Sequence, residues 1–222
     1  GGEVGEHLVK PVGHVLPVAG GELGEKIEQQ IIEKVGIRPI AYFARGPRNL
    51  TTNRPITSPE ELDGLKMRVP NVPLFLNVWK ALGANPTPMA FSEVFTSLQN
   101  GTIDAQENPL ALIKSANFNE VQDYVNLTQH VRSWIYLTLS DMAWQQMSEE
   151  DQAAVMEAAA RAQDWEREQF LADEQELQAE LEGLGMEFVE VDSAAFAAAA
   201  KEAVLNSVAD EIRPDVEQLF AE

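Results

Sequence analysis

Short apolar runs alternate with helical segments between residues 45 and 130, and this alternation constrains the fold more than any other feature. Apolar and charged residues alternate over 65–69, which is the pattern of a half-buried strand. Further strands are predicted at 103–107 and 124–128, and helices of about ten residues lie between the strands. Strands separated by helices of this length predict an α/β fold with a mostly parallel sheet.

Longer elements are predicted on both sides of this region. Apolar residues recur at helical spacing over 22–35 and Gly36 follows, which predicts a helix that ends there. Ser148 is expected to cap a long helix that ends near Gly183. The remaining predictions are strands at 37–44, 134–139 and 187–191, and a helix over 194–220 that is interrupted at Pro214.

Three polar residues are expected to cap shorter helices. Ser58 begins a capping box in which a proline takes the first helical position. Asn71 is expected to cap the following helix. Ser92 is expected to cap the next one, in which Val94 and Leu98 face inward.

Charge and composition exclude several classes of partner. Asp and Glu total 36 against 16 Lys and Arg, and the formal net charge is −20. This charge repels phosphate backbones and anionic lipid, which argues against nucleic acid and a bare membrane as partners. No stretch approaches the ~20 uncharged apolar residues of a spanning helix, and the absence of cysteine excludes thiol chemistry. The first six residues lack the basic and apolar runs of a signal peptide, so we expect any export signal to have been removed already.

Residues that could carry catalysis or bind a metal form no recognisable motif. His7 and His14 are separated by Pro11 and Gly13, so they cannot share a helical face, and we predict no metal site. His130 follows a predicted strand and is expected to be a structural hydrogen-bonding residue. Nucleophile elbows, phosphate-binding loops and dinucleotide fingerprints are absent from the sequence. Most carboxylates are expected on solvated faces, among them Glu166, Glu168, Asp173 and Glu174.

Arg68 is the most informative charged residue. It stands at the carboxyl end of a predicted strand, where ligands bind in open α/β sheets, and Asn71 follows at a predicted helix start. A guanidinium matches a carboxylate with two parallel hydrogen bonds, each worth about 1.5–3 kcal/mol, against the ~8 kcal/mol of micromolar binding. The alternative is that Arg68 only pairs at the surface with an acid of the preceding segment, namely Glu60, Glu61 or Asp63.

Four linked motifs strengthen the ligand-binding interpretation. They are Arg-Asn-Leu-Thr-Thr-Asn at 48–53, Gly-Leu-Lys-Met-Arg-Val-Pro-Asn at 64–71, Gly-Ala-Asn-Pro-Thr-Pro-Met-Ala-Phe-Ser-Glu at 83–93 and Gly-Thr-Ile-Asp-Ala-Gln-Glu-Asn-Pro-Leu at 101–110. In order and spacing these strings resemble the DctP-type solute-binding proteins of tripartite ATP-independent periplasmic (TRAP) transporters. The resemblance extends over roughly residues 20–222.

The resemblance implies a two-lobed α/β fold of the periplasmic binding protein type, with a long connecting helix and lobes that close on a ligand. Residues 46–130 would form lobe II. Residues 1–45 would be a remnant of lobe I, and 131–222 would form the crossover strand, the long helix and the elements that return to lobe I. Such a protein captures a small organic acid (a sugar acid, dicarboxylate or 2-oxo acid) in the periplasm. It delivers the acid to the membrane subunits of the transporter, and we expect it to act as a monomer without a cofactor.

The resemblance also assigns roles to individual residues. Arg68 would form the salt bridge to the ligand carboxylate, with Arg48 as a second cationic contact and Asn108 as an amide that holds the same group. Phe91 would lie against the ligand, and Asn71 would support Arg68. Two further positions complete the predicted site: Glu107, expected to orient Arg68 rather than act as an acid or base, and Trp134, which could line either the pocket or the core.

The resemblance fails at the front of the chain, because Gly1 to Ala19 match no part of the family. We therefore expect an incomplete first lobe, which lacks residues that in the family select the acid. One alternative function is a hydrolase or isomerase that acts on an organic acid through carboxylates such as Glu93 and Glu107. Another is a helical interaction module built on residues 148–183, although the apolar face of that helix is too irregular for a heptad seam.

Overall fold

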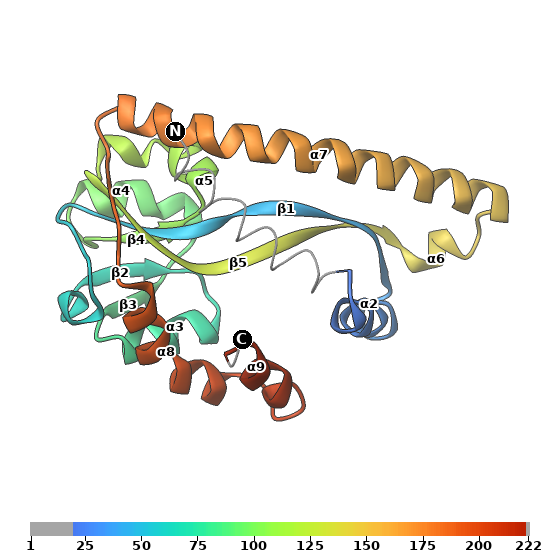
Figure 1. Cartoon of the computed structure of the whole chain (residues 1–222), viewed down its shortest axis with the longest axis horizontal. Helices are drawn as coiled ribbons and strands as arrows, with labels where there is room; N and C mark the ends of the chain where they lie inside the picture. Colours follow the sequence, from blue (N-terminus) through green and yellow to red (C-terminus); the bar gives the residue numbers. More distant parts are fainter. Residues whose placement is uncertain (1–19, 221–222) are drawn as a thin grey trace. The chain divides into compact units, whose positions relative to one another are not determined.

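The computed structural model of the chain describes residues 20–220, and His7 and His14 lie outside this range. The chain divides into two units (Figure 1). Among the described residues, the first contains 20–47 together with Val131–Leu177, and the second contains Arg48–His130 together with 178–220. That residues 46–130 form lobe II of a two-lobed protein stays a prediction.

The first unit contains α2 (Glu22–Val35), α6 (Asp141–Trp144) and most of the long helix α7 (Glu149–Gly183), with parts of strands β1 and β5. Helix α2 has the predicted bounds, with acidic residues in its first turn and Lys34 in its last, as the helix dipole favours. It ends because Gly36 adopts φ 72° and donates its N–H to the Ile32 carbonyl. Ser148 begins α7 as predicted, since its Oγ accepts a hydrogen bond from the Asp151 N–H at 3.1 Å.

Replacing Gly36 by alanine should destabilise the protein by about 1–2 kcal/mol, because a Cβ is disfavoured at positive φ. An added Cβ would meet nothing within 4 Å, so conformation alone accounts for the cost. Urea unfolding measures the effect. The matched control is Gly183→Ala, at another open position whose φ is not positive, and it should be neutral or slightly stabilising. Equal effects at the two glycines would contradict this interpretation.

Strands β1 (Ile37–Thr52) and β5 (Tyr124–Ser140) are longer than predicted and run through both units. The strand predicted at 37–44 continues to Thr52, because Gly46 and Pro47 are accommodated within it rather than forming a turn. The strands predicted at 124–128 and 134–139 are one element, which Gln129 interrupts only locally with φ 43°.

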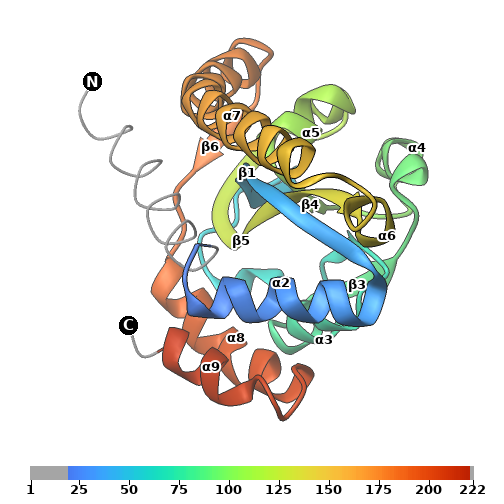
Figure 2. The same ribbon diagram turned by 90° about the vertical axis from the view of Figure 1, so that its right-hand side faces the viewer.

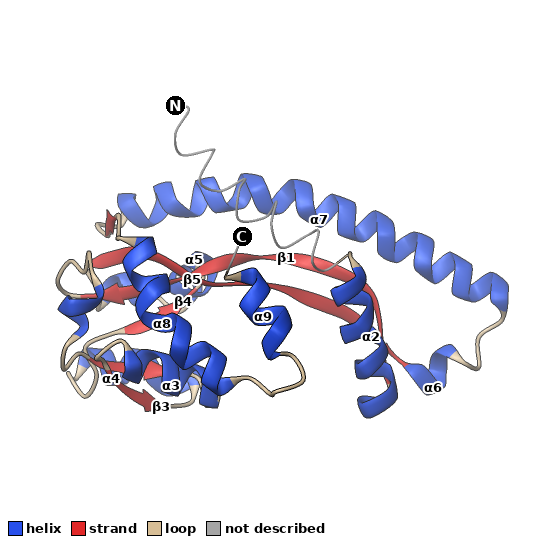
Figure 3. Cartoon of the chain, turned by 60° about the horizontal axis from the view of Figure 1, so that its bottom comes forward, coloured by secondary structure: helices blue, strands red, loops and turns tan. Residues whose placement is uncertain are grey.

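The second unit carries two sheets and the hydrophobic core described in the structure. Parallel pairs join β2 (Lys66–Val69) to β3 (Asn85–Pro88) and β5 to β6 (Glu187–Val189), whereas β1 and β4 (Gln106–Asn108) are antiparallel. The sheet orders are β4-β1-β5-β6 and β2-β3. The core includes Leu50, Ile56, Leu62, Leu65, Met67, Val69, Trp79, Leu82, Ala84, Ala105 and Phe196. The helices are α3 (Pro73–Ala81), α4 (Val94–Gln99), α5 (Leu110–Ser115), α8 (Ser193–Ser207) and α9 (Arg213–Leu219), and α8 lies beside α3 in Figure 3.

Two of the predicted caps are wrong. Asn71 is exposed and Val72 is the N-cap of α3, because Pro73 takes the first position of that helix. Ser92 lies inside a short 3₁₀ segment (Phe91–Glu93) that precedes α4, although Val94 and Leu98 of α4 are buried as predicted.

Ser58 is the N-cap of the 3₁₀ segment Pro59–Leu62 and is followed by Pro59 as predicted, but its side chain makes no capping hydrogen bond. Glu61 instead accepts the backbone N–H of Thr57 at 2.6 Å. Near the C-terminus the predicted interruption is also displaced, because Pro214 lies in the first turn of α9, where proline is tolerated, and the break precedes it. Within residues 20–220, no helix combines the length and apolar character needed to cross a membrane.

Candidate functional site

Arg68 is held in place by backbone groups of neighbouring segments. It lies on β2, opposite Thr87 of β3, and donates its backbone N–H to the Ala105 carbonyl at 2.8 Å. Its side chain is only 5% exposed, and its Nε donates to the Met89 carbonyl at 2.9 Å. The Phe91 ring centroid lies 5.9 Å from its guanidinium carbon. A neutral carbonyl therefore orients the guanidinium without neutralising its charge.

No described carboxylate lies within 4.0 Å of the Arg68 guanidinium, so residues 20–220 supply it with no ion pair. The alternative of surface pairing is wrong, because Arg68 is buried and Glu61 bonds to Thr57 instead. Burial lowers the pKa of Arg68, and the charge of Glu107 partly offsets that effect. A guanidinium remains charged at any pH a protein tolerates, so Arg68 is a buried cation without an ion-pair partner among residues 20–220.

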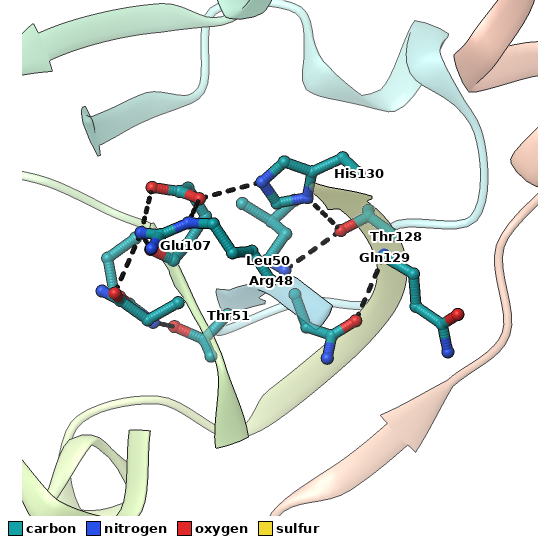
Figure 4. Close-up of polar contacts among 10 residues, drawn as sticks. Arg48, Leu50, Thr51, Glu107, Thr128, Gln129 and His130 are labelled. Carbon is teal, nitrogen blue, oxygen red and sulfur yellow. Dashed lines mark hydrogen bonds and ion pairs between the residues drawn. The ribbon is translucent and has the colours of Figure 1, made fainter. Parts of the chain in front are cut away.

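Arg48 and Glu107 form a buried ion pair beside this cation. The antiparallel register of β1 and β4 sets Leu50 opposite Glu107, with Arg48 nearby in the same strand as Leu50. Arg48 Nε and Nη2 donate to the Glu107 carboxylate at 2.5 and 2.7 Å, and Nη2 also donates to the Glu107 carbonyl (Figure 4). Glu107 is fully buried. Arg48 also lies over the Phe75 ring, 5.5 Å from its centroid.

His130 is the third member of this buried cluster. Its Nε2 lies 2.9 Å from Glu107 Oε2, and its Nδ1 lies 2.8 Å from Thr128 Oγ1. Because a carboxylate only accepts hydrogen bonds, Nε2 carries the proton in this arrangement. The interpretation of His130 as a structural hydrogen-bonding residue is confirmed. Sequence reasoning missed its partner, since the two residues are 23 positions apart and no local pattern links them.

These contacts keep Glu107 ionised. Burial by itself raises the pKa of Glu107, but the hydrogen bonds from His130 and Arg48 outweigh it, so the pKa lies below its ordinary value. Glu107 is predicted to orient Arg68, but the described residues show no hydrogen bond between these two side chains. The Glu107 carboxylate bonds to Arg48 and His130 instead, and it acts on Arg68 only through its charge.

Asn108 belongs to a second buried chain of polar contacts. Its Oδ1 accepts from Arg48 Nη2 at 2.9 Å, and its Nδ2 donates to Gln106 Oε1 at 2.6 Å. Gln106 in turn donates to Thr51 Oγ1, which donates to Gln122. This chain fixes the orientation of the Asn108 amide and leaves one of its two N–H groups for a further acceptor.

The remaining predicted residues are placed differently. Phe91 is 40% exposed and lies edge-to-face on Phe118, so one side of its ring is available beside Arg68. Asn71 is exposed and makes no hydrogen bond described for residues 20–220, so its supporting role stays a prediction. Trp134 belongs to the first unit, where its ring meets Tyr136 edge-on with centroids 6.0 Å apart.

Glu107 and Arg48 already use polar atoms of their side chains in hydrogen bonds within the protein. Glu107 has no exposed surface, and the described bonds of Arg48 use its Nε and Nη2. Arg68, Phe91 and the free N–H of Asn108 are the groups that can meet a small anion. Among the described residues, no three side chains of the metal-ligating types converge on one point.

Comparison with known proteins identifies related chains. Residues 8–211 match the model of the DctP family, described as bacterial extracellular solute-binding protein, family 7. A solute-binding protein of Roseobacter denitrificans is 68% identical over 216 residues, which cover 97% of this chain and 66% of that protein. The chain thus spans about two thirds of the length of the curated relatives it matches.

Solved structures give the same result. A TRAP periplasmic solute-binding protein from Roseobacter denitrificans, with bound L-galactonate, has a TM-score of 0.84 and 70% identity, covering 91% of this chain and 68% of that one. A counterpart from Sulfitobacter, with bound β-D-galacturonate, has a TM-score of 0.85 and 30% identity, covering 93% and 71%. The predicted mixed α/β class is confirmed by this likeness, and so is the resemblance noted in the sequence.

Proposed function

Since the chain belongs to the bacterial extracellular solute-binding proteins of family 7, we propose that it binds a small sugar acid through the Arg68 guanidinium. The single observation that carries the proposal is that this guanidinium is buried and fixed, yet has no acidic partner among residues 20–220. An incoming carboxylate would supply the missing counter-charge through two parallel hydrogen bonds. Relatives that bind L-galactonate and β-D-galacturonate support a sugar acid as the ligand class.

The neighbouring groups complete the proposed carboxylate site. Phe91 supplies an apolar surface beside the cation, and Asn108 supplies an amide N–H. Arg48 contributes positive charge, but most of that charge is balanced by Glu107. The overall charge of −20 would repel an anion elsewhere on the molecule, so the unbalanced Arg68 gives this position its selectivity.

The same proposal extends to location and partners. Proteins similar to this chain are TRAP periplasmic solute-binding proteins, which supports a periplasmic protein that delivers its ligand to the membrane subunits of a TRAP transporter. We further propose that it acts as a monomer.

The competing function, a hydrolase or isomerase, requires a carboxylate that can exchange a proton with a substrate. Glu107 is fully buried, accepts hydrogen bonds from Arg48 and His130, and has a lowered pKa, which makes it a weak base. Glu93 is exposed and belongs to a short 3₁₀ segment. The chemistry of these two groups favours binding over catalysis.

Titration calorimetry with matched ligands tests the proposal. L-galactonate and D-galacturonate should bind, whereas the neutral sugars L-galactose and D-galactose should bind far more weakly, because they lack the carboxylate that meets Arg68. Mass spectrometry of the recovered ligand should show it unchanged. Equal binding of acid and neutral sugar, or no binding of any acid, would contradict the proposal, and turnover would favour the enzyme.

A further inference from the structure

Helix α7 runs beside strand β1 in the first unit (Figure 2), and polar side chains of the helix bond to the strand. Gln163 Oε1 accepts the Tyr42 backbone N–H at 2.8 Å, and Glu166 Oε2 accepts the Ala44 N–H at 2.9 Å. Alternate N–H groups of a strand point to the same edge, so successive polar residues of the helix satisfy successive donors of the strand. The expectation that Glu166 is only a solvated surface residue is wrong.

Glu174 approaches the same strand two residues further along, at Gly46, but one oxygen of its carboxyl group is left without a partner. The side chain is only 3% exposed, and Oε2 is buried without a hydrogen-bond partner. The expectation of a solvated Glu174 is therefore wrong as well. A Cβ added at Gly46 would lie 2.6 Å from Glu174 Oε1, and the φ of Gly46 is not positive. A side chain at position 46 would therefore have to displace the Glu174 carboxyl group from the space that it occupies.

The surroundings of Glu174 disfavour its charged form. Burial raises its pKa to about 7, and the negative charge of Asp173 adds to the shift. On β1 the charged neighbour of Gly46 is Arg45, which strand alternation directs to the opposite face. The ionisable residues that β5 contributes to this unit are Arg132 and Tyr136.

We propose that Glu174 is a proton-controlled latch between α7 and β1. In its neutral form the carboxyl group packs against Gly46 and keeps the helix on the strand. When the group ionises, the unpaired charge turns toward water and loosens that contact. Gly46 lies two residues before Arg48 in the same strand. Ionisation of Glu174 should therefore make the segment of β1 that leads to Arg48 more mobile.

The direction of the pH effect follows from linkage. The pKa of Glu174 is raised in the folded chain, so the folded state holds more protons than the unfolded state between about pH 4.5 and 7. Stability from this group is complete below that window and is lost as the pH rises through about 7. Glu174→Gln removes the titration while keeping the shape. The ratio of the unfolding constants of wild type and variant should therefore change on the order of 10²-fold between about pH 5 and pH 8.

Urea unfolding at these two pH values measures the change, with the exposed Glu168→Gln as a matched control that should follow the wild type. Amide hydrogen exchange supplies a local readout, since the Ala44 N–H bonded to Glu166 should lose protection at high pH in the wild type and keep it in Glu174→Gln. The proposal is overturned if wild type and Glu174→Gln show the same pH dependence, or if the Ala44 protection does not respond.

A second comparison does not depend on how well Glu174→Gln folds. Gly46→Ala should cost more stability in the wild type than in a Glu174→Ala background, because only in the wild type must the new methyl group displace the carboxyl. Carbon NMR of the Glu174 carboxyl in the unmodified protein should give a titration midpoint near 7. Equal costs in both backgrounds, or an ordinary carboxyl midpoint, would refute the latch.

Discussion

Replacing Arg68 by alanine should weaken sugar-acid binding by about 3 to 6 kcal/mol, or a factor of roughly 10² to 10⁴ in Kd, because two charge-assisted hydrogen bonds are lost. Arg68→Lys should also bind weakly, since an ammonium group cannot reproduce the planar fork. Titration calorimetry with L-galactonate measures both variants.

Arg54→Ala is the matched control for this prediction. It removes the same charge from an exposed residue of the second unit, which donates to the Glu61 carbonyl. The Kd of this control should stay close to that of the wild type, because exposed charges are screened. Arg68→Ala binding as tightly as the parent, or Arg54→Ala weakening binding equally, would refute the role assigned to Arg68.

Glu107→Gln should destabilise the protein by about 3–5 kcal/mol, because it leaves the buried Arg48 guanidinium without its counter-charge. The amide NH₂ of the new glutamine could also face Arg48 and His130, which are themselves hydrogen-bond donors. Urea unfolding measures the loss, with Glu93→Gln as an exposed control. The double variant Arg48→Met with Glu107→Leu should recover much of the stability, because neither charge is then buried.

The effect of Glu107 should depend on pH. Its pKa is lowered in the folded chain, so its contribution is present above the pKa of the unfolded state and is lost as the pH falls through the lower folded value. The difference in the free energy of unfolding between wild type and Glu107→Gln should therefore become smaller at acidic pH. A difference below about 1 kcal/mol at neutral pH would show that the buried pair does not stabilise the fold.

Local sequence patterns were sufficient to predict several elements, including the strand that carries Arg68. Alternation over 65–69 identified β2, and helical spacing with a closing Gly36 identified α2 with its observed bounds. These patterns depend only on residues a few positions apart, which is why the sequence alone reveals them. Caps were harder, because Pro73 changes which residue can begin α3 and leaves Asn71 outside the helix.

The polar interior could not be predicted from local patterns. Arg48 and Glu107 are 59 residues apart, and only the pairing of β1 with β4 brings them together. Glu174 lies in a helix whose acidic residues suggest a solvated face, yet its position against Gly46 buries it. The strand predicted at 37–44 continues through Gly46 and Pro47 to Thr52. Tertiary pairing decides each of these cases.

A crystal structure of the chain with L-galactonate would test the central claim most directly. We predict that both carboxylate oxygens lie about 2.7–2.9 Å from the Arg68 guanidinium nitrogens, with Glu107 still bonded to Arg48. A carboxylate bound elsewhere on the protein, or Arg68 turned to pair with Glu107 while the ligand is present, would contradict the account.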